Sequence, residues 1–192
     1  MRNILKIFVV LGAAFALAAC APSLHPFFTE EDIVFNDELL GEWVNDSGEK
    51  CKFTKSGANH YEFLVEDEDP ARFKARLFKL GDVTYLDLYP EPLSKEEPLG
   101  KAIDTYPGNI VVGHSLARVT IGKNSISIAM MDGDWLKELS DQKRINLAHE
   151  RLDGGAIVLT APTRDLQYFV LKHAGDKELF DDDEVFHRVK SI

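Results

Sequence analysis

Short runs with a two-residue hydrophobic period, separated by turn residues, constrain the fold more than any other feature of the chain. In one such run the apolar Tyr61, Phe63 and Val65 alternate with polar neighbours. Successive side chains of a strand point to opposite faces of a sheet, so this period predicts strands with one apolar and one wet face. The expected strands are Glu42–Val44, Lys50–Ser56, His60–Glu66, Arg72–Leu80 and Val83–Tyr89.

The links between these runs are short and rich in Gly, Asn, Asp and Ser, so consecutive strands are expected to pair as antiparallel neighbours. Two further strands, Ile110–Ile121 and Ser125–Met131, are expected to pair across Gly122-Lys123-Asn124. A meander of this kind avoids exposed edges by closing on itself. The sequence therefore predicts a mainly β protein built on an up-and-down antiparallel barrel.

The last third of the chain has a different pattern. Asp134–Leu139 is expected to form a short helix, capped by Asp132 or Asp134. A second helix is expected to begin near Pro162-Thr163, because Leu166, Phe169, Val170 and His173 recur at helical spacing before Gly175. Strands are expected at Ala156–Thr160 and Val185–Val189. The barrel is therefore predicted to carry two short C-terminal helices.

The amino terminus has the layout of an export signal. A basic start is followed by an apolar or small run from Ile7 to Ala19, which is too short for a membrane-spanning helix. Leu17-Ala18-Ala19-Cys20 resembles the lipobox of bacterial lipoproteins. That resemblance implies cleavage before Cys20 and attachment of fatty acyl chains, such as palmitate, to this residue. The alternative is an ordinary cleaved signal with a chance cysteine.

We therefore divide the chain into a signal peptide (1–19), a lipidated Cys20 with its N-terminal tether or leader (20–36) and one barrel domain (37–192). Part of the leader is expected to pack on the domain, because it carries several large apolar residues. The expected location is the bacterial cell envelope, on the membrane through the lipid of Cys20. In a Gram-negative host, the lipoprotein resemblance implies the periplasmic face of the outer membrane. The only other cysteine, Cys51, is expected to pack inside a strand, with a reactive thiol as the alternative.

Charge excludes one class of partner. The formal net charge is −10, so the protein repels nucleic acid and we expect no nucleic-acid binding. The acidic runs at 66–69 and 181–184 are interpreted as solvated turns, with calcium binding as an alternative. The six histidines show no paired metal-ligand spacing, and we expect neither a metal site nor a cofactor.

The first strand begins with Leu40-Gly41-Glu42-Trp43, which resembles the Gly-x-Trp signature of lipocalins and their calycin relatives. In those folds the tryptophan closes one end of the barrel. Together with Asp134-Trp135-Leu136 and Leu159–Thr163, the chain resembles uncharacterised bacterial lipoproteins with a lipocalin-like domain. The two late helices depart from simple lipocalins, and Trp43 is alternatively a core residue of an unrelated sheet.

Six residues are candidates for binding a ligand in or at the barrel. They are Trp43, Tyr85, Asp87, Tyr89, His114 and Arg118. Asp87 and His114 are polar residues within apolar strands, so they could fix the polar end of an apolar ligand if they face the lumen. The alternative is an outward, solvated face or a satisfied hydrogen bond in a core.

The preferred function is a non-enzymatic envelope module that binds an apolar or lipidic small molecule. A second hypothesis is a structural lipoprotein with a filled barrel, whose outer face or Pro90–Pro107 loop meets an envelope protein. A third is a serine esterase, because Gly113-His114-Ser115-Leu116-Ala117 resembles the nucleophile elbow of α/β hydrolases. That elbow requires a strand, a turn and a helix, whereas Ser115 precedes a β-branched run typical of a continuing strand.

Overall fold

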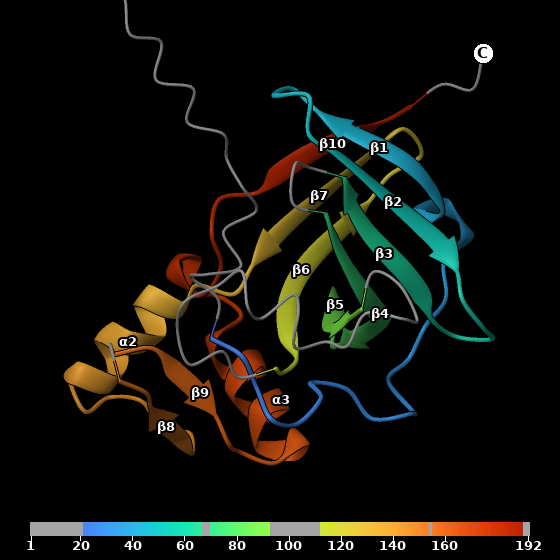
Figure 1. Cartoon of the computed structure of the whole chain (residues 1–192). Coiled ribbons are helices and arrows are strands. Elements are labelled where there is room, and N and C mark those ends of the chain that lie inside the picture. Colours follow the sequence, from blue (N-terminus) through green and yellow to red (C-terminus); the bar gives the residue numbers. More distant parts are fainter. Residues whose placement is uncertain (1–20, 67–69, 93–111, 154, 190–192) are drawn as a thin grey trace, which may run out of the picture.

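Eight strands form a closed antiparallel barrel in the computed structural model, which describes residues 21–66, 70–92, 112–153 and 155–189 (Figure 1). Around the barrel the strand order is β1-β10-β7-β6-β5-β4-β3-β2. Their bounds are β1 Gly41–Asn45, β2 Lys50–Lys55, β3 Tyr61–Glu66, β4 Ala71–Leu80, β5 Val83–Glu91, β6 Ser115–Ile121, β7 Ser125–Met130 and β10 Glu184–Arg188. The predicted mainly β, up-and-down barrel with two short helices is confirmed.

The first and last strands close the barrel. Trp43 of β1 lies opposite Cys51 of β2 on one side and opposite Arg188 of β10 on the other. Strand β10 also pairs with β7, where Phe186 lies opposite Ile126. Closure gives each of the eight strands a neighbour on both sides, so the barrel has no edge strand.

The remaining elements are inserted between β7 and β10 and gather on one side of the barrel (Figure 1). They are α2 Gly133–Asp141, β8 His149–Arg151, β9 Ile157–Leu159, α3 Thr163–His173 and the 3-10 helix η2 Lys177–Leu179. Asp132 caps α2, because its side chain accepts hydrogen bonds from the backbone of Asp134 and Trp135. Strands β8 and β9 form a separate two-stranded sheet.

Two hydrophobic cores lie on opposite sides of one barrel wall. The inner core fills the lumen with residues such as Phe53, Phe63 and Phe73. The outer core packs α2, α3 and the N-terminal segment against outward-facing Phe78 and Tyr85. Because both faces of this wall are covered, the two-residue period lapses in β4 and β5, where neighbouring residues are buried together.

The N-terminal segment 21–36 packs on the domain from its first described residue. Ala21 and Ser23 are buried, and Ser23 forms isolated bridges with both His114 and Leu159. Further along, the backbone of Val34 donates to the carbonyl of Leu77. This contact covers the part of β4 that β3 does not reach, since the β3–β4 ladder ends at the pair Tyr61 and Ala75. The leader, which was expected to pack in part on the domain, does so from Ala21 onward.

Some boundaries differ from expectation. The strand expected at 110–121 begins at Ser115, and residues 110 and 111 lie outside the described residues. The loop expected from Pro90 begins later, because Pro90 and Glu91 still pair with β4 and continue β5. The rest of that loop, from 93 to 107, lies outside the described residues, as do 67–69 of the first acidic run. Strand β8 was not predicted.

Candidate functional site

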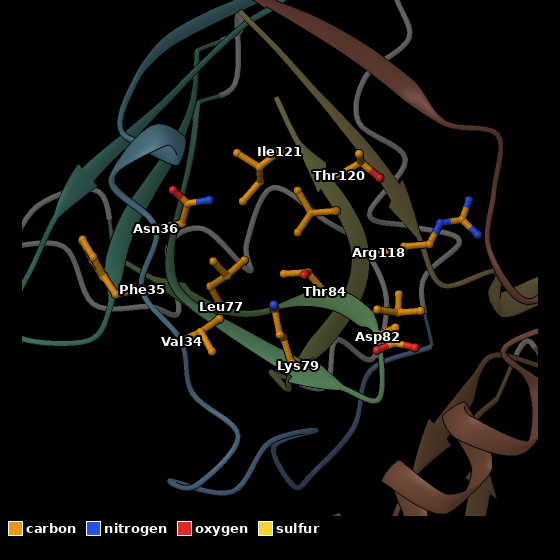
Figure 2. Close-up of a pocket in the computed structure, with 12 residues that line it drawn as sticks. Val34, Phe35, Asn36, Leu77, Lys79, Asp82, Thr84, Arg118, Thr120 and Ile121 are labelled. Atoms are coloured by element: carbon orange, nitrogen blue, oxygen red, sulfur yellow. The ribbon is translucent and has the colours of Figure 1, made fainter. Parts of the chain in front are cut away.

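A pocket of about 630 Å³ opens at one end of the barrel, where the wall between β5 and β6 splits (Figure 2). The β5–β6 ladder ends at the pair Tyr85 and Arg118, and beyond it Val119–Ile121 of β6 pair with β7. The N-terminal segment forms the opposite side. The lining residues are Val34, Phe35, Asn36, Leu77, Lys79, Asp82, Val83, Thr84, Arg118, Val119, Thr120 and Ile121.

Aromatic stacking and hydrogen bonds hold the N-terminal side of the pocket in place. The ring of Phe35 stacks on Tyr61 with 4.6 Å between centroids, and the amine of Lys55 lies 4.5 Å from the Phe35 centroid on the barrel rim. The backbone N–H of Asn36 donates to the Tyr61 hydroxyl at 2.7 Å, and this hydroxyl donates to the Asn36 carbonyl at 3.1 Å. These contacts fix the segment across the opening.

The floor of the pocket is apolar and closed. Figure 2 shows Leu77, Thr84 and Ile121 pointing into the pocket. Leu77 and Val119 are buried and belong to the inner core. Below them the lumen is packed with side chains, including Phe53, Phe63 and Phe73. An eight-stranded barrel is just wide enough for side chains to fill it or for one small ligand, and in this barrel large side chains occupy the space beneath the pocket.

Lys79 brings a positive charge into this pocket. It lies on the lumen face of β4, two residues after Leu77, and its side chain extends toward the pocket centre (Figure 2). Its backbone N–H donates to the carbonyl of Asp32, which fixes the strand there. Within the described ranges its amine has no hydrogen-bond or ion-pair partner. The side chain is exposed and therefore free to meet a ligand.

Arg118 borders the same pocket, but its side chain makes its contacts on the outer face of the barrel. Its guanidinium points away from the pocket (Figure 2) and donates to Asp183 at 3.1 Å. It also lies over the ring of Phe180, 5.1 Å from the centroid. Arg118 thus joins the last third of the chain to β6, and it is not placed to hold a ligand inside the lumen.

Trp43 lies at the same barrel end as the pocket, beneath the 3-10 helix η1 (Asp37–Leu39). Its indole N–H donates to the carbonyl of Leu39 at 3.0 Å, and the guanidinium of Arg188 lies 4.1 Å from its ring centroid. Arg188 also donates to the Leu40 carbonyl at 2.7 Å. Gly41, at φ 127°, passes so close to Arg188 that a Cβ would lie 2.8 Å from its Nη1. This half of the barrel end is therefore sealed.

Tyr85, Asp87, Tyr89 and His114 lie on the outer face of the wall, not in the lumen. On β5 the lumen positions belong to Leu86 and Leu88, so the alternate residues face outward. Asp87 is 1% exposed. Its carboxylate accepts from the backbone N–H of Phe27 at 2.9 Å and contacts Nδ1 of His114 at 2.7 Å. Of the alternatives considered for Asp87, the satisfied hydrogen bond in a core is the one found.

The remaining members of that group complete the outer face. The ring of His114 lies 4.9 Å from that of Tyr89, which is 37% exposed. The ring of Tyr85 packs 5.7 Å from that of Phe78 in the outer core. Because this face meets the N-terminal segment, these residues link that segment to the barrel. They do not reach the pocket that Lys79 enters.

Ser115 lies in a continuing strand. It is the first residue of β6 and pairs with Leu88 of β5. The carboxylate that contacts His114 lies on the opposite, outer face, so the strand does not present Ser115 to that histidine. Among the described residues, no three His, Cys, Asp or Glu side chains lie close enough together to hold a metal ion.

Cys51 is buried in the inner core, 1% exposed. Burial, reinforced by the carboxylates of Glu184 and Glu66, raises the pKa of its thiol to about 12. The thiolate is the reactive form of cysteine, so this residue is a packing group in the folded protein.

Comparisons with family models, curated proteins and solved structures find no match for this chain. The eight-stranded antiparallel barrel is compatible with a lipocalin-like fold. Each helix in the described ranges is too short or too polar to cross a bilayer.

Two residues that matter at this barrel end were missed by the sequence analysis. Lys79 follows Leu77 by two positions and so carries the signal of an inward position, but it was assigned no role. Arg188 stands next to the end of the chain, and only closure of β10 on β1 brings it to Trp43. Lys79 shares the two-residue period of the apolar face of its strand, and this pattern could have indicated a charged side chain directed into the barrel.

Proposed function

We propose that this protein is a cell-envelope lipoprotein that binds a small apolar or amphipathic molecule at the mouth of its barrel without altering it chemically. The pocket beside Thr84 and Lys79 is the observation that carries this proposal. Its volume of about 630 Å³ lies within the usual range for small-molecule sites, and barrel mouths are a common place for them. Its floor is apolar, and its rim is polar.

The proposed anchor is the lipid of Cys20, which would keep the protein on the membrane of the bacterial envelope. In a Gram-negative host we place it on the periplasmic face of the outer membrane. Two acyl chains suffice for stable anchoring. Because Ala21 is already buried, an anchor at Cys20 would hold the domain against the membrane without a free tether.

Metabolic labelling tests the anchor. With an alkyne analogue of palmitate in a bacterial host, the complete chain is expected to take up label, and Cys20→Ser is expected to abolish it because only this thiol would carry the thioether. Cys51→Ser is the matched control and should retain full labelling, since Cys51 is buried. Label that persists in Cys20→Ser would contradict lipid attachment at this residue.

Binding of the neutral probe N-phenyl-1-naphthylamine tests the pocket. The chain from Ala21 onward, which contains every element described here, is expected to bind it stoichiometrically in a fluorescence titration. Thr84→Phe should weaken binding by about tenfold or more, because the ring would occupy the space that the probe needs. Thr54→Phe, on the outer face of β2, is the control and should leave the affinity unchanged.

The filled lumen favours one rival, a structural or interaction lipoprotein that needs no ligand. This rival predicts that the probe does not bind and that in-cell cross-linking yields one defined envelope protein. A wild-type chain that fails to bind the probe would therefore remove the ligand-binding proposal and leave the rival in place.

A further inference from the structure

We propose that the ligand of the barrel mouth is a small anionic amphiphile, whose carboxylate, sulfonate or phosphate meets the amine of Lys79 while its short apolar body lies on Leu77, Val119 and Ile121. This inference rests on the proposed binding function and specifies its ligand class. Three features of the pocket lead to it: the charge, the floor and the depth.

The charge is the unused amine of Lys79. Most other charged groups near this pocket have partners of their own. Arg118 is paired with Asp183, and the carboxylate of Asp32 accepts hydrogen bonds from Thr29 and Gln167. Asp82 is the one acid among the lining residues, and it lies in the exposed turn between β4 and β5, without a bond to Lys79. An anion would therefore supply the partner that the described chain does not.

The floor selects an apolar body beside that charge. Leu77 and Val119 are buried inner-core residues, and Ile121 packs against the same core. In Figure 2 the side chains of Leu77 and Ile121 surround the space toward which the Lys79 amine extends. A ligand that covers this surface removes apolar area from water, whereas a bare inorganic anion would not.

The depth limits the length of the ligand. Leu86, which lies opposite Leu77 on β5, and Phe63 of the same inner core are at most 1% exposed, so side chains fill the lumen there. A long acyl chain cannot pass this layer without displacing core side chains, since protein interiors are packed as densely as organic crystals. The fitting class is therefore a compact or short-chain anion.

A matched pair of probes tests this ligand class. The anionic 8-anilinonaphthalene-1-sulfonate and the neutral N-phenyl-1-naphthylamine share one aromatic body and differ by the sulfonate. We expect the wild-type chain to prefer the anionic probe by about fivefold, the size of a partly exposed charge contact. Lys79→Met should abolish this preference, so that the variant binds the two probes with equal affinity. Lys74→Met, on the outer face of the same strand, should change neither affinity.

Displacement of the anionic probe by competing anions tests whether the apolar floor contributes to binding. Octanoate should displace the anionic probe from the wild-type chain, and inorganic phosphate at the same concentration should not. Three results would overturn the ligand class and leave the binding function in place. They are equal affinity of the wild type for both probes, loss of the anionic preference in Lys74→Met as large as in Lys79→Met, and displacement of the anionic probe by phosphate but not by octanoate. Loss of the neutral probe in Lys79→Met would show a structural role for Lys79 and would also overturn the ligand class. Failure of the wild type to bind either probe would overturn the binding function itself.

Discussion

Burial determines the chemistry of Cys51. Its side chain packs among inner-core residues, where a charged thiolate loses the solvation that water would provide. Nearby Glu184 and Glu66 add like-charge repulsion, so its pKa rises to about 12 from the ordinary 9.0. The folded state therefore favours the neutral thiol. The resulting contribution to stability is complete below pH 9 and is lost as the pH rises toward 12.

We predict that Cys51 reacts with a thiol reagent only after unfolding. The chain from Ala21 onward contains this single cysteine, so the number of labelled thiols reports on it directly. At pH 8 the native protein should remain unlabelled over hours, and in concentrated urea labelling should be complete within minutes. Rapid, stoichiometric labelling of the native protein would contradict the burial of Cys51.

Asp87 and His114 show that a polar residue in an apolar strand can face either the lumen or the outside of the barrel. Each is polar within an apolar strand, and the period alone does not say which face meets the lumen. The structure turns both outward, where the backbone N–H of Phe27 and the Asp87–His114 contact satisfy the carboxylate. A buried carboxylate without such partners would cost several kcal/mol, which explains why the N-terminal segment lies where it does.

At the scale of elements, the N-terminal segment acts as an additional strand. The backbone N–H of Val34 donates to the Leu77 carbonyl of β4, and that of Lys79 donates to the Asp32 carbonyl of the segment. Ser23 bridges His114, just before β6, and Leu159 of β9. The segment is held to α3 as well, because the side chain of Gln167 donates to the Phe27 carbonyl at 3.0 Å. It therefore connects the barrel to the elements inserted before β10.

We predict that Phe27→Ala destabilises the whole domain. Phe27 is 1% exposed in the outer core, and truncating a buried phenylalanine costs about 3–5 kcal/mol in unfolding free energy. Urea denaturation followed by circular dichroism would measure this loss. Tyr168→Ala, at a tyrosine that is 68% exposed on α3, is the control and should change stability by less than about 0.5 kcal/mol. Equal effects of both substitutions would show that the segment is not part of the core.

The N-terminal cap of helix α2 is the one that local sequence predicted. Asp132 was one of two residues predicted to cap this helix, and its carboxylate accepts from the first free backbone N–H groups. Helix α3 lacks such a side-chain cap, since Pro162 precedes it, and its stability comes from burying Leu166, Phe169 and Val170. Both helices could be predicted because capping and helical spacing are properties of neighbouring residues.

At the scale of the whole molecule, closure and filling of the barrel decide what it can bind. Inward-facing residues of the eight strands include several aromatic rings, and these rings fill much of the lumen. The ladder between β5 and β6 then stops short, and the N-terminal segment covers only part of the resulting opening. The pocket is thus a product of unequal strand lengths and of one segment placed across the rim.

The sequence by itself determined the barrel strands, the two helices and the barrel class, because a two-residue period, turn residues and caps act between near neighbours. Only the tertiary structure decided that Asp87 faces outward, that Arg188 reaches Trp43 and that Lys79 stands in an open pocket. Each of these depends on pairing between segments far apart in the chain. Such pairing is set by the packing of the whole barrel, which no local pattern encodes.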